Sequence, residues 1–303
     1  MRNKLTYSRP RGANVSYTRP YTQPQTALYF QLQMANLIRS AKDSDDWTQN
    51  ELAAYNITIV TQNKQEFFGS ADLPVPVIPS LSGFMTSEDR EHAVDGETRK
   101  VLHHLDLALN QREGYQAAII NFAVNILKKM GYDSDDRRDD GGDRIIFFDS
   151  ELPLDICGVS CEAFIGASVM GDDNEVLLLL DSDSEENITL DDTEPQLVAQ
   201  AIAAYAANNK VRTASLNLPP LADATLPAIL MKGTVPVLYK IPVTAELYAA
   251  VQQGTYPALE TRVLRYVPVL PSPHEPGMGP LENRVESLAC LEAFKRFVGD
   301  KSR

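Results

Sequence analysis

The chain has few cysteines and no long apolar run, and both features restrict what it can be. Its 303 residues include three cysteines, too few for the disulfide framework of a small secreted domain. No apolar stretch approaches the roughly 20 residues that a membrane-spanning helix needs. The N-terminal residues lack the apolar core of a secretory signal. We therefore expect an intracellular protein, cytoplasmic or nuclear, with no membrane partner.

Acidic residues are missing from the start of the chain, although the chain as a whole is acidic. The formal net charge is -13, and Asp43 is the first carboxylate. The basic residues before it are Arg2, Lys4, Arg9, Arg11, Arg19, Arg39 and Lys42. An acidic body disfavours non-specific binding to nucleic acid, because that binding depends on neutralising phosphates. Any contact with nucleic acid is therefore expected through the N-terminal segment.

Residues 1–25 are predicted to form a flexible basic arm. Tyr7, Tyr17 and Tyr21 stand among arginines and prolines, without the pattern of a packed core. One interpretation is a disordered tail, or an extended arm packed on the body. The other is an arm that contacts nucleic acid through basic and aromatic side chains.

Hydrophobic periodicity divides the rest of the chain into three parts. We assign residues 26–100 to an N-terminal extension packed on the core, 101–268 to the core, and 269–303 to a C-terminal loop and helix. Helical patterns cover 27–41, 45–55, 101–130, 193–205, 245–252 and 286–298. Strand patterns cover 56–60, 144–148, 162–170, 175–180, a hairpin at 229–241, and 262–267. This order predicts an α/β fold with a central mixed sheet flanked by helices.

The centre of the predicted core is a buried strand that ends in carboxylates. An apolar run from Glu175 to Leu180 stops at Asp181 and Asp183, which suits a strand buried on both faces with acids at its tip. A helix follows, and we predict that Thr193 and Gln196 form its capping box. The many alanines of this helix would let it pack closely on the sheet.

Six short motifs in order carry a family resemblance over roughly residues 47–268. They are Glu51–Ile57, Phe67–Gly69, Phe122–Val124 with Gly131–Tyr132, Ile156–Gly158, Glu194–Ala204, and Gly233–Pro236 with Tyr239–Pro242. The order helix, three strands, helix, two strands resembles the core of the restriction-endonuclease-like, or PD-(D/E)XK, superfamily. The motifs themselves resemble a group of uncharacterised proteins from mushroom-forming fungi. The resemblance implies a restriction-endonuclease-like core with an N-terminal helical extension.

The resemblance also implies where an active site would lie. In this superfamily an Asp on the second core strand and an acid on the third hold Mg²⁺, and a lysine two residues later stabilises negative charge. The third-strand acid falls on Asp181, whereas the lysine position holds Asp183 and the second-strand position holds Gly166. Gln196 and Gln200 match the helix glutamines of the superfamily, one turn apart.

Two of the three central residues are thus replaced, which implies a remnant site. Its candidate catalytic residues are Asp181, Gln196 and Gln200. Asp155 or Glu162 could supply a displaced carboxylate, and Asp181, Asp183 and Asp155 form the candidate metal site. The plainer interpretation is that these acids belong to a solvated loop and that the glutamines only cap and decorate a helix.

Three hypotheses for function follow. The first, which we favour, is a non-catalytic nuclease-like protein that acts through protein binding or regulation and needs no cofactor. The second is a Mg²⁺-dependent DNA endonuclease or exonuclease with relocated metal ligands, to which the basic arm would bring DNA. The third is a different enzyme on the same scaffold, because a fold does not fix a function.

Overall fold

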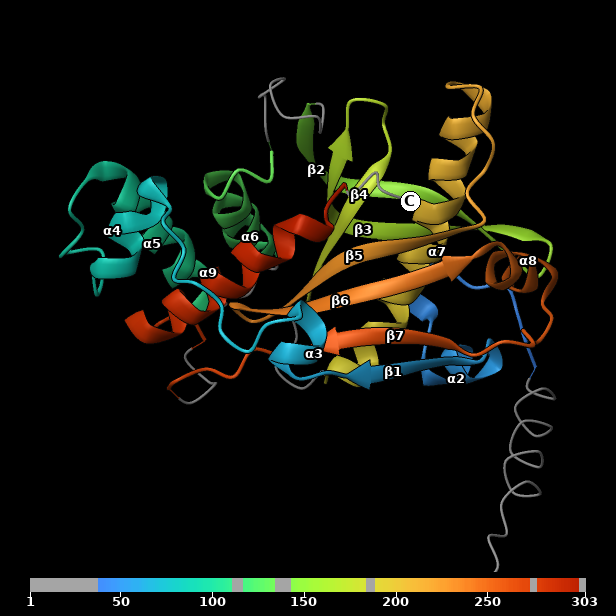
Figure 1. Cartoon of the computed structure of the whole chain (residues 1–303), viewed down its shortest axis with the longest axis horizontal. Helices are drawn as coiled ribbons and strands as arrows, with labels where there is room; N and C mark the ends of the chain where they lie inside the picture. The colour runs from blue at the N-terminus through green and yellow to red at the C-terminus, as the bar shows by residue number, and fades with distance from the viewer. Residues whose placement is uncertain (1–37, 111–116, 134–142, 184–188, 273–276, 300–303) are drawn as a thin grey trace, which may run out of the picture.

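One mixed β-sheet with helices on both faces organises the chain (Figure 1). The structure is a computed structural model and describes residues 38–110, 117–133, 143–183, 189–272 and 277–299. These residues form a seven-stranded sheet in the order β1-β7-β6-β5-β4-β3-β2. The predicted α/β class, with a central mixed sheet flanked by helices, is confirmed. The predicted basic arm, residues 1–25, lies outside the described residues.

The strands and helices have the following bounds. The strands are β1 (Ile57–Thr61), β2 (Arg144–Ile156), β3 (Val159–Gly171), β4 (Val176–Asp183), β5 (Asp223–Lys232), β6 (Val235–Thr244) and β7 (Thr261–Tyr266). The α-helices are α2 (Gln49–Ala54), α3 (Lys64–Phe68), α4 (Ser82–Thr86), α5 (Gly96–Leu109), α6 (Ala118–Lys129), α7 (Leu190–Ala214), α8 (Ala245–Gln253) and α9 (Leu281–Phe294). Three 3₁₀ turns are η1 (Ser44–Asp46), η2 (Pro79–Leu81) and η3 (Lys295–Phe297).

Connection lengths set the strand directions. β2, β3 and β4 follow one another through short turns and pair antiparallel. A parallel neighbour needs a long crossover, which α7 and its flanking segments supply before β5 pairs parallel with β4. β5, β6 and β7 pair antiparallel, and β1 lies parallel to β7 at the sheet edge. The N-terminal extension therefore supplies a strand of the sheet as well as helices.

Each face of the sheet has its own apolar core. One core contains buried residues of α5, α6 and α9, and the other contains buried residues of α7 and α8. Several buried residues of α7 are small: Ala199, Ala201, Ala203 and Ala204 are each at most 1% exposed. Small side chains let the α7 backbone lie close to the strands, as the alanine pattern predicted.

The start of α7 differs from the prediction. The helix begins at Leu190, not at the predicted cap of Thr193 and Gln196. The Asp192 carboxylate instead accepts hydrogen bonds from the backbone N–H and the hydroxyl of Thr189. Pro195 consequently lies inside the helix, where it cannot donate to the carbonyl of Asp191. The Gln49 side chain donates to that carbonyl at 2.7 Å and so replaces the hydrogen bond that the proline cannot make.

The hairpin of β2 and β3 is longer than predicted. The predicted strands stop at residue 148 and resume at 162, whereas the ladder continues to Ile156 and starts again at Val159. Cys157 and Gly158 form a two-residue turn with φ of 53° and 77°, as a tight antiparallel hairpin requires. Pro153 hid this strand from sequence analysis, but a proline is tolerated there because β2 lies at the edge of the sheet.

Two of the predicted helices also need correction. The helical pattern over 101–130 corresponds to two helices, α5 and α6, separated by residues outside the description. The pattern over 27–41 lies mostly outside the described residues. The part that is described, 38–41, is not helical, and Ile38 is 93% exposed.

Side chains of the β2–β3 hairpin that point to one face of the sheet before Asp149 and Gly166 point to the other face after them. On one side of this point Ile146, Ala167 and Val169 belong to the α6 core, and on the other side Leu152, Leu154, Ala163 and Ile165 belong to the α7 core. Asp149 has a φ of 48°, and a left-handed residue within an extended strand reverses the alternation of side chains. Even-numbered residues of β2 therefore face different cores before and after Asp149.

A buried arginine joins α9 to the N-terminal extension. Arg284 is 1% exposed, and its guanidinium donates to five backbone carbonyls, those of Phe84, Ser87, Glu88, Met278 and Gly279, at 2.7–2.9 Å. Its guanidinium also lies 4.9 Å from the ring centroid of Phe84. Burial lowers the pKa of Arg284. The Arg284 side chain thus supplies the hydrogen-bond donors for backbone carbonyls at the end of α4 and in the loop before α9.

Within the described ranges, none of the helices combines the length and apolar character that crossing a bilayer requires.

Candidate functional site

The candidate site lies where β3 and β4 separate. β4 pairs with β3 only through residues 176–180, and its final residues pair with β5 instead. Asp181 is the first residue beyond the last β3–β4 pair, Ala167 with Leu180. The Asp181 carboxylate therefore lies near the end of a central strand, at the fork where β3 and β4 diverge.

Two glutamines of α7 hold the Asp181 carboxylate. Gln200 Nε2 lies 2.5 Å from Asp181 Oδ2 and 2.6 Å from the Phe164 carbonyl. Gln196 Nε2 lies 3.4 Å from the same Asp181 oxygen. The backbone N–H of Ser182 donates to the other oxygen, Oδ1, at 2.8 Å. The structure thus brings together the three predicted residues Asp181, Gln196 and Gln200.

The site has one buried acceptor without a hydrogen-bond partner. Gln200 is fully buried, and its Oε1 has no partner within the described part of the chain. The amide cannot be flipped to pair it, because the Phe164 carbonyl requires the nitrogen on its side.

Gly166 lies directly beside Asp181. A Cβ atom built on Gly166 would lie 3.4 Å from Asp181 Oδ1, 3.3 Å from the Leu180 carbonyl and 3.1 Å from Ile120 Cδ1. The two positions that the resemblance pairs as metal ligands are therefore neighbours in space. Position 166 supplies no ligand, and a larger residue would have to displace Ile120.

A segment that sequence analysis did not single out closes the fork. Ser44 is fully buried in η1, and its hydroxyl accepts a hydrogen bond from the Phe164 N–H at 3.1 Å. The Asp43 carboxylate accepts from the Glu162 N–H at 2.9 Å. These two side chains act as the missing neighbour of β3, along the edge that β4 leaves open. The fork is therefore filled by the chain itself.

The same segment brings a second carboxylate to the site. Gln196 Nε2 donates to Asp45 Oδ1 at 2.9 Å while also lying near Asp181, so one amide bridges the two acids. Burial is the main cause that raises the pKa of Asp181, to about 6. The hydrogen bonds from Gln200 and Ser182 oppose the rise, and the charge of Asp45 adds to it. Sequence spacing gave no signal for Asp45, because it lies far from Asp181 in the chain.

Of the other two predicted metal ligands, Asp155 does not join this group. Asp155 pairs with Ser160 near the hairpin turn, and six residue steps along β3, about 20 Å of extended strand, lead from Ser160 to Gly166. Its carboxylate accepts a hydrogen bond from the hydroxyl of Tyr248. Asp183 ends β4, where it pairs with Lys232. Among the described residues, no three His, Cys, Asp or Glu side chains converge as a metal site would require.

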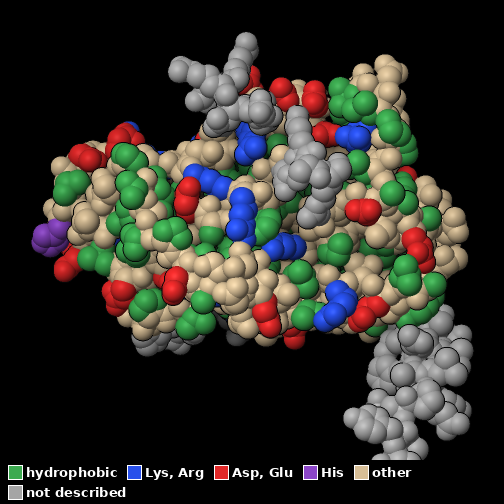
Figure 2. All heavy atoms as spheres, viewed as in Figure 1, with side chains coloured by type: hydrophobic (Ala, Val, Ile, Leu, Met, Phe, Trp, Pro, Cys, Tyr) green, Lys and Arg blue, Asp and Glu red, His purple; other side chains and the backbone are tan. Residues whose placement is uncertain are grey.

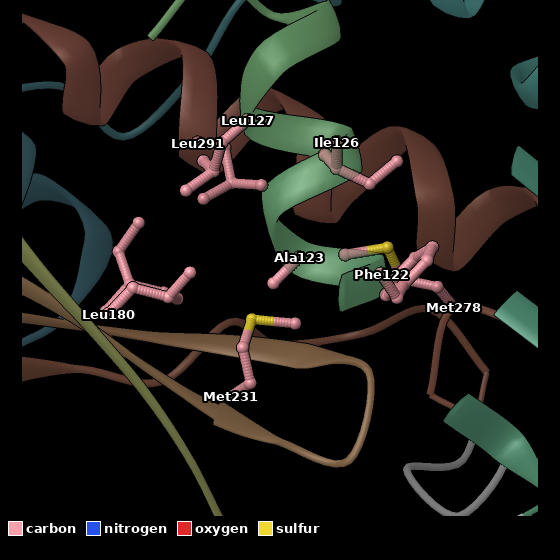
Figure 3. Close-up of a pocket in the computed structure, with 9 residues that line it drawn as sticks. Phe122, Ala123, Ile126, Leu127, Leu180, Met231, Met278 and Leu291 are labelled. Atoms are coloured by element: carbon pink, nitrogen blue, oxygen red, sulfur yellow. The ribbon is translucent and has the colours of Figure 1, made fainter. Parts of the chain in front are cut away.

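Two cavities lined by described residues lie away from this carboxylate. The first is an apolar gap of about 10 Å³ between α6, α9 and the sheet, where Leu180 and Met231 face Ala123 (Figure 3). Without polar groups, so small a space holds no ordered water and is a packing gap. A larger hollow of about 320 Å³ lies by the first residues of β4 and β5, at the opposite end of β4 from Asp181. Neither cavity can deliver a ligand to Asp181.

The hydroxyl of Ser44 offers a direct test of how firmly η1 is held. Ser44→Ala is expected to lower the free energy of unfolding by about 1–2 kcal/mol, because the Phe164 N–H loses its acceptor where water cannot replace it. Urea denaturation measures the change. Ser82→Ala, which removes an exposed hydroxyl bonded to Pro79, should have little effect. Equal losses in both variants would contradict the assigned role of Ser44.

Comparisons of the chain with models of known protein families and with curated proteins find no match.

Proposed function

We propose that this chain is a non-catalytic protein with a restriction-endonuclease-like fold, and that it acts through contacts with other proteins. The observation that carries the proposal is the state of the Asp181 site. Its carboxylate lies beside a glycine, and its oxygens accept hydrogen bonds from the N–H groups of Gln200 and Ser182. The second acid and the lysine that a nuclease of this superfamily uses are replaced by Gly166 and Asp183.

The order of elements supports the assignment to this fold. Helix α6 precedes the antiparallel strands β2, β3 and β4, helix α7 crosses over, and β5 pairs parallel with β4. This is the order that the resemblance implies for a PD-(D/E)XK core. The positions of Asp181 on β4, Gly166 on β3 and the two glutamines on α7 also support the proposal.

The surface charge supports a protein partner over a nucleic acid. The chain has a net charge of -13. On the face shown in Figure 2, acidic side chains are scattered around the outline, and Lys and Arg side chains gather toward the middle. Two of the described lysines are paired with acids, Lys129 with Glu97 and Lys295 with Glu292. Binding to the phosphate backbone of a nucleic acid would require a longer, continuous row of Lys and Arg side chains.

Asp45 favours the second candidate function, a Mg²⁺-dependent nuclease with relocated ligands. It places a second carboxylate one bridging amide away from Asp181, and the unpaired Gln200 Oε1 is a third oxygen. The arrangement fits a metal poorly, because the Gln196 and Gln200 amide nitrogens already donate to Asp181 Oδ2. A metal ligand must offer lone pairs, and here they are occupied by N–H groups.

Metal titration and a cleavage assay separate the two candidates. We expect no heat of binding with Mg²⁺ or Mn²⁺ and no cleavage of plasmid or single-stranded DNA, for the wild type and for Asp181→Ala alike. Metal-dependent cleavage that disappears in both Asp181→Ala and Asp45→Ala would overturn the non-catalytic proposal. Asp155→Ala is the matched control, because that carboxylate lies too far away to share a metal with Asp181.

A further inference from the structure

The first half of β2 is an open and apolar edge of the sheet. β2 is the last strand in the order, and within the described residues its only strand partner is β3. Ile145, Phe147 and Phe148 are 48%, 47% and 42% exposed. The stretch reads Arg-Ile-Ile-Phe-Phe-Asp-Ser from residue 144 to 150. Edge strands normally carry a lysine, a proline or a bulky cover against pairing, and this stretch has neither lysine nor proline.

The edge also has opposite charges at its two ends. Arg144 starts the strand, while Glu151 and Glu162 lie together beyond the face change. Because the alternation reverses at Asp149, Arg144 and Glu151 project from the same face of the sheet, the α6 face. The charge of Glu151 is the main cause that raises the pKa of Glu162, so this pair of acids would gain from a nearby cation.

A strand with one basic and one acidic end is complementary to its own copy when the two run antiparallel. Each basic end then meets the acidic end of the other copy, whereas a parallel arrangement would bring like charges together. A two-fold axis perpendicular to the sheet also keeps Ile145 and Phe147 of both copies on one side. Cross-strand pairs of such residues stabilise an antiparallel ladder.

We propose that two copies of this chain associate through β2, antiparallel about a two-fold axis near Phe147, and that the two sheets join into one. With the axis at Phe147, Arg144 of each copy lies opposite Ser150 of the other and one residue from Glu151. The contact uses the same surface twice, so it closes at the dimer and leaves no β2 edge exposed. It covers the apolar residues that are otherwise in water.

The first experiment measures the mass of the full chain in solution over about 1 µM to about 200 µM by sedimentation velocity and light scattering. We expect a dimer that dissociates on dilution. A monomer at every concentration would overturn the proposal, and so would a continuing series of larger polymers, because the contact is closed.

A charge exchange tests the register. Arg144→Glu and Glu151→Arg should each weaken the dimer at least about tenfold, because each puts like charges together twice. An equimolar mixture of the two variants should restore a dimer with one chain of each kind, because both contacts are then between opposite charges. Failure of the mixture to associate would overturn the proposed pairing.

A matched control separates the edge from the rest of the surface. Leu259→Lys introduces a charge at a residue that is 70% exposed and lies before β7, away from β2. It should leave the dimer unchanged, whereas Phe147→Lys should give a monomer with an unchanged circular dichroism spectrum. Equal behaviour of these two folded variants would overturn the assignment of the interface to β2.

Discussion

Arg284→Met is expected to lower the free energy of unfolding by about 4 kcal/mol or more. Its guanidinium is buried and donates to five backbone carbonyls from two segments of the chain. A buried hydrogen bond to a charged group contributes about 1.5–3 kcal/mol, and an acceptor left unpaired in the interior keeps its desolvation cost. Methionine fills a similar volume, so the loss comes from the unpaired carbonyls. The loss is comparable to the total stability of many domains.

Denaturant unfolding of the purified chain measures this loss. Arg212→Met provides the control, because Arg212 forms a single 3.6 Å ion pair with Glu175 near the surface, and such a pair contributes at most about 1 kcal/mol. Arg284→Lys should also destabilise the fold, since one ammonium has only three donors for five acceptors. If Arg284→Met unfolds within about 1 kcal/mol of the wild type, the described network does not hold α9 in place.

The free energy of unfolding is expected to fall as the pH rises through the titration of Asp181. The pKa of Asp181 is about 6 in the folded chain, against an ordinary value of 3.8. Between these values the folded state keeps a proton that the unfolded state has lost, so stability is greatest below the lower pKa and declines up to the higher one. The full change is about 3 kcal/mol, of which about 2 kcal/mol separates pH 4.5 from pH 7.5.

Asp181→Asn removes this titration without changing the size of the side chain. Its stability should lack the decline of about 2 kcal/mol that the wild type shows over the same pH range. Asp192→Asn is a control of opposite sign, because hydrogen bonds from Thr189 lower the pKa of Asp192. That carboxylate contributes stability above its ordinary pKa and loses it as the pH falls. Parallel pH profiles for the wild type and Asp181→Asn would contradict a buried, proton-binding Asp181.

Local patterns in the sequence predicted the strand that carries Asp181 and the helix after it, and the family resemblance assigned Gln196 and Gln200 to the site. An apolar run that stops at Asp181 predicts a buried strand with an acid at its tip. Gln196 and Gln200 lie one turn apart on the next helix, which must pass back over the sheet. Strand tip and helix are close in the chain, so their meeting follows from short-range geometry. The same reasoning located the turn of β5 and β6 and the helix that Thr244 caps.

Long-range contacts left no such pattern. Asp43, Ser44 and Asp45 reach the site through side-chain bonds to strand and helix residues more than 100 positions away. Neither hydrophobic periodicity nor residue spacing predicts that these three residues lie at the site. Asp155 was predicted as a displaced carboxylate ligand because the second-strand position holds Gly166. The longer ladder carries Asp155 to the far end of β2, where no contact with Asp181 is possible.

The alanine face of α7 has a consequence for how the fold can vary. The reach of Gln196 and Gln200 to Asp181 depends on the distance between α7 and β4, and the buried alanines of α7 contribute to that distance. A bulkier residue at Ala201 would lift the helix, and both amides would withdraw from the carboxylate together. The packing of α7 on the sheet and its hydrogen bonds to Asp181 are therefore coupled. A change in side-chain volume in this part of the core would also change the pKa of Asp181.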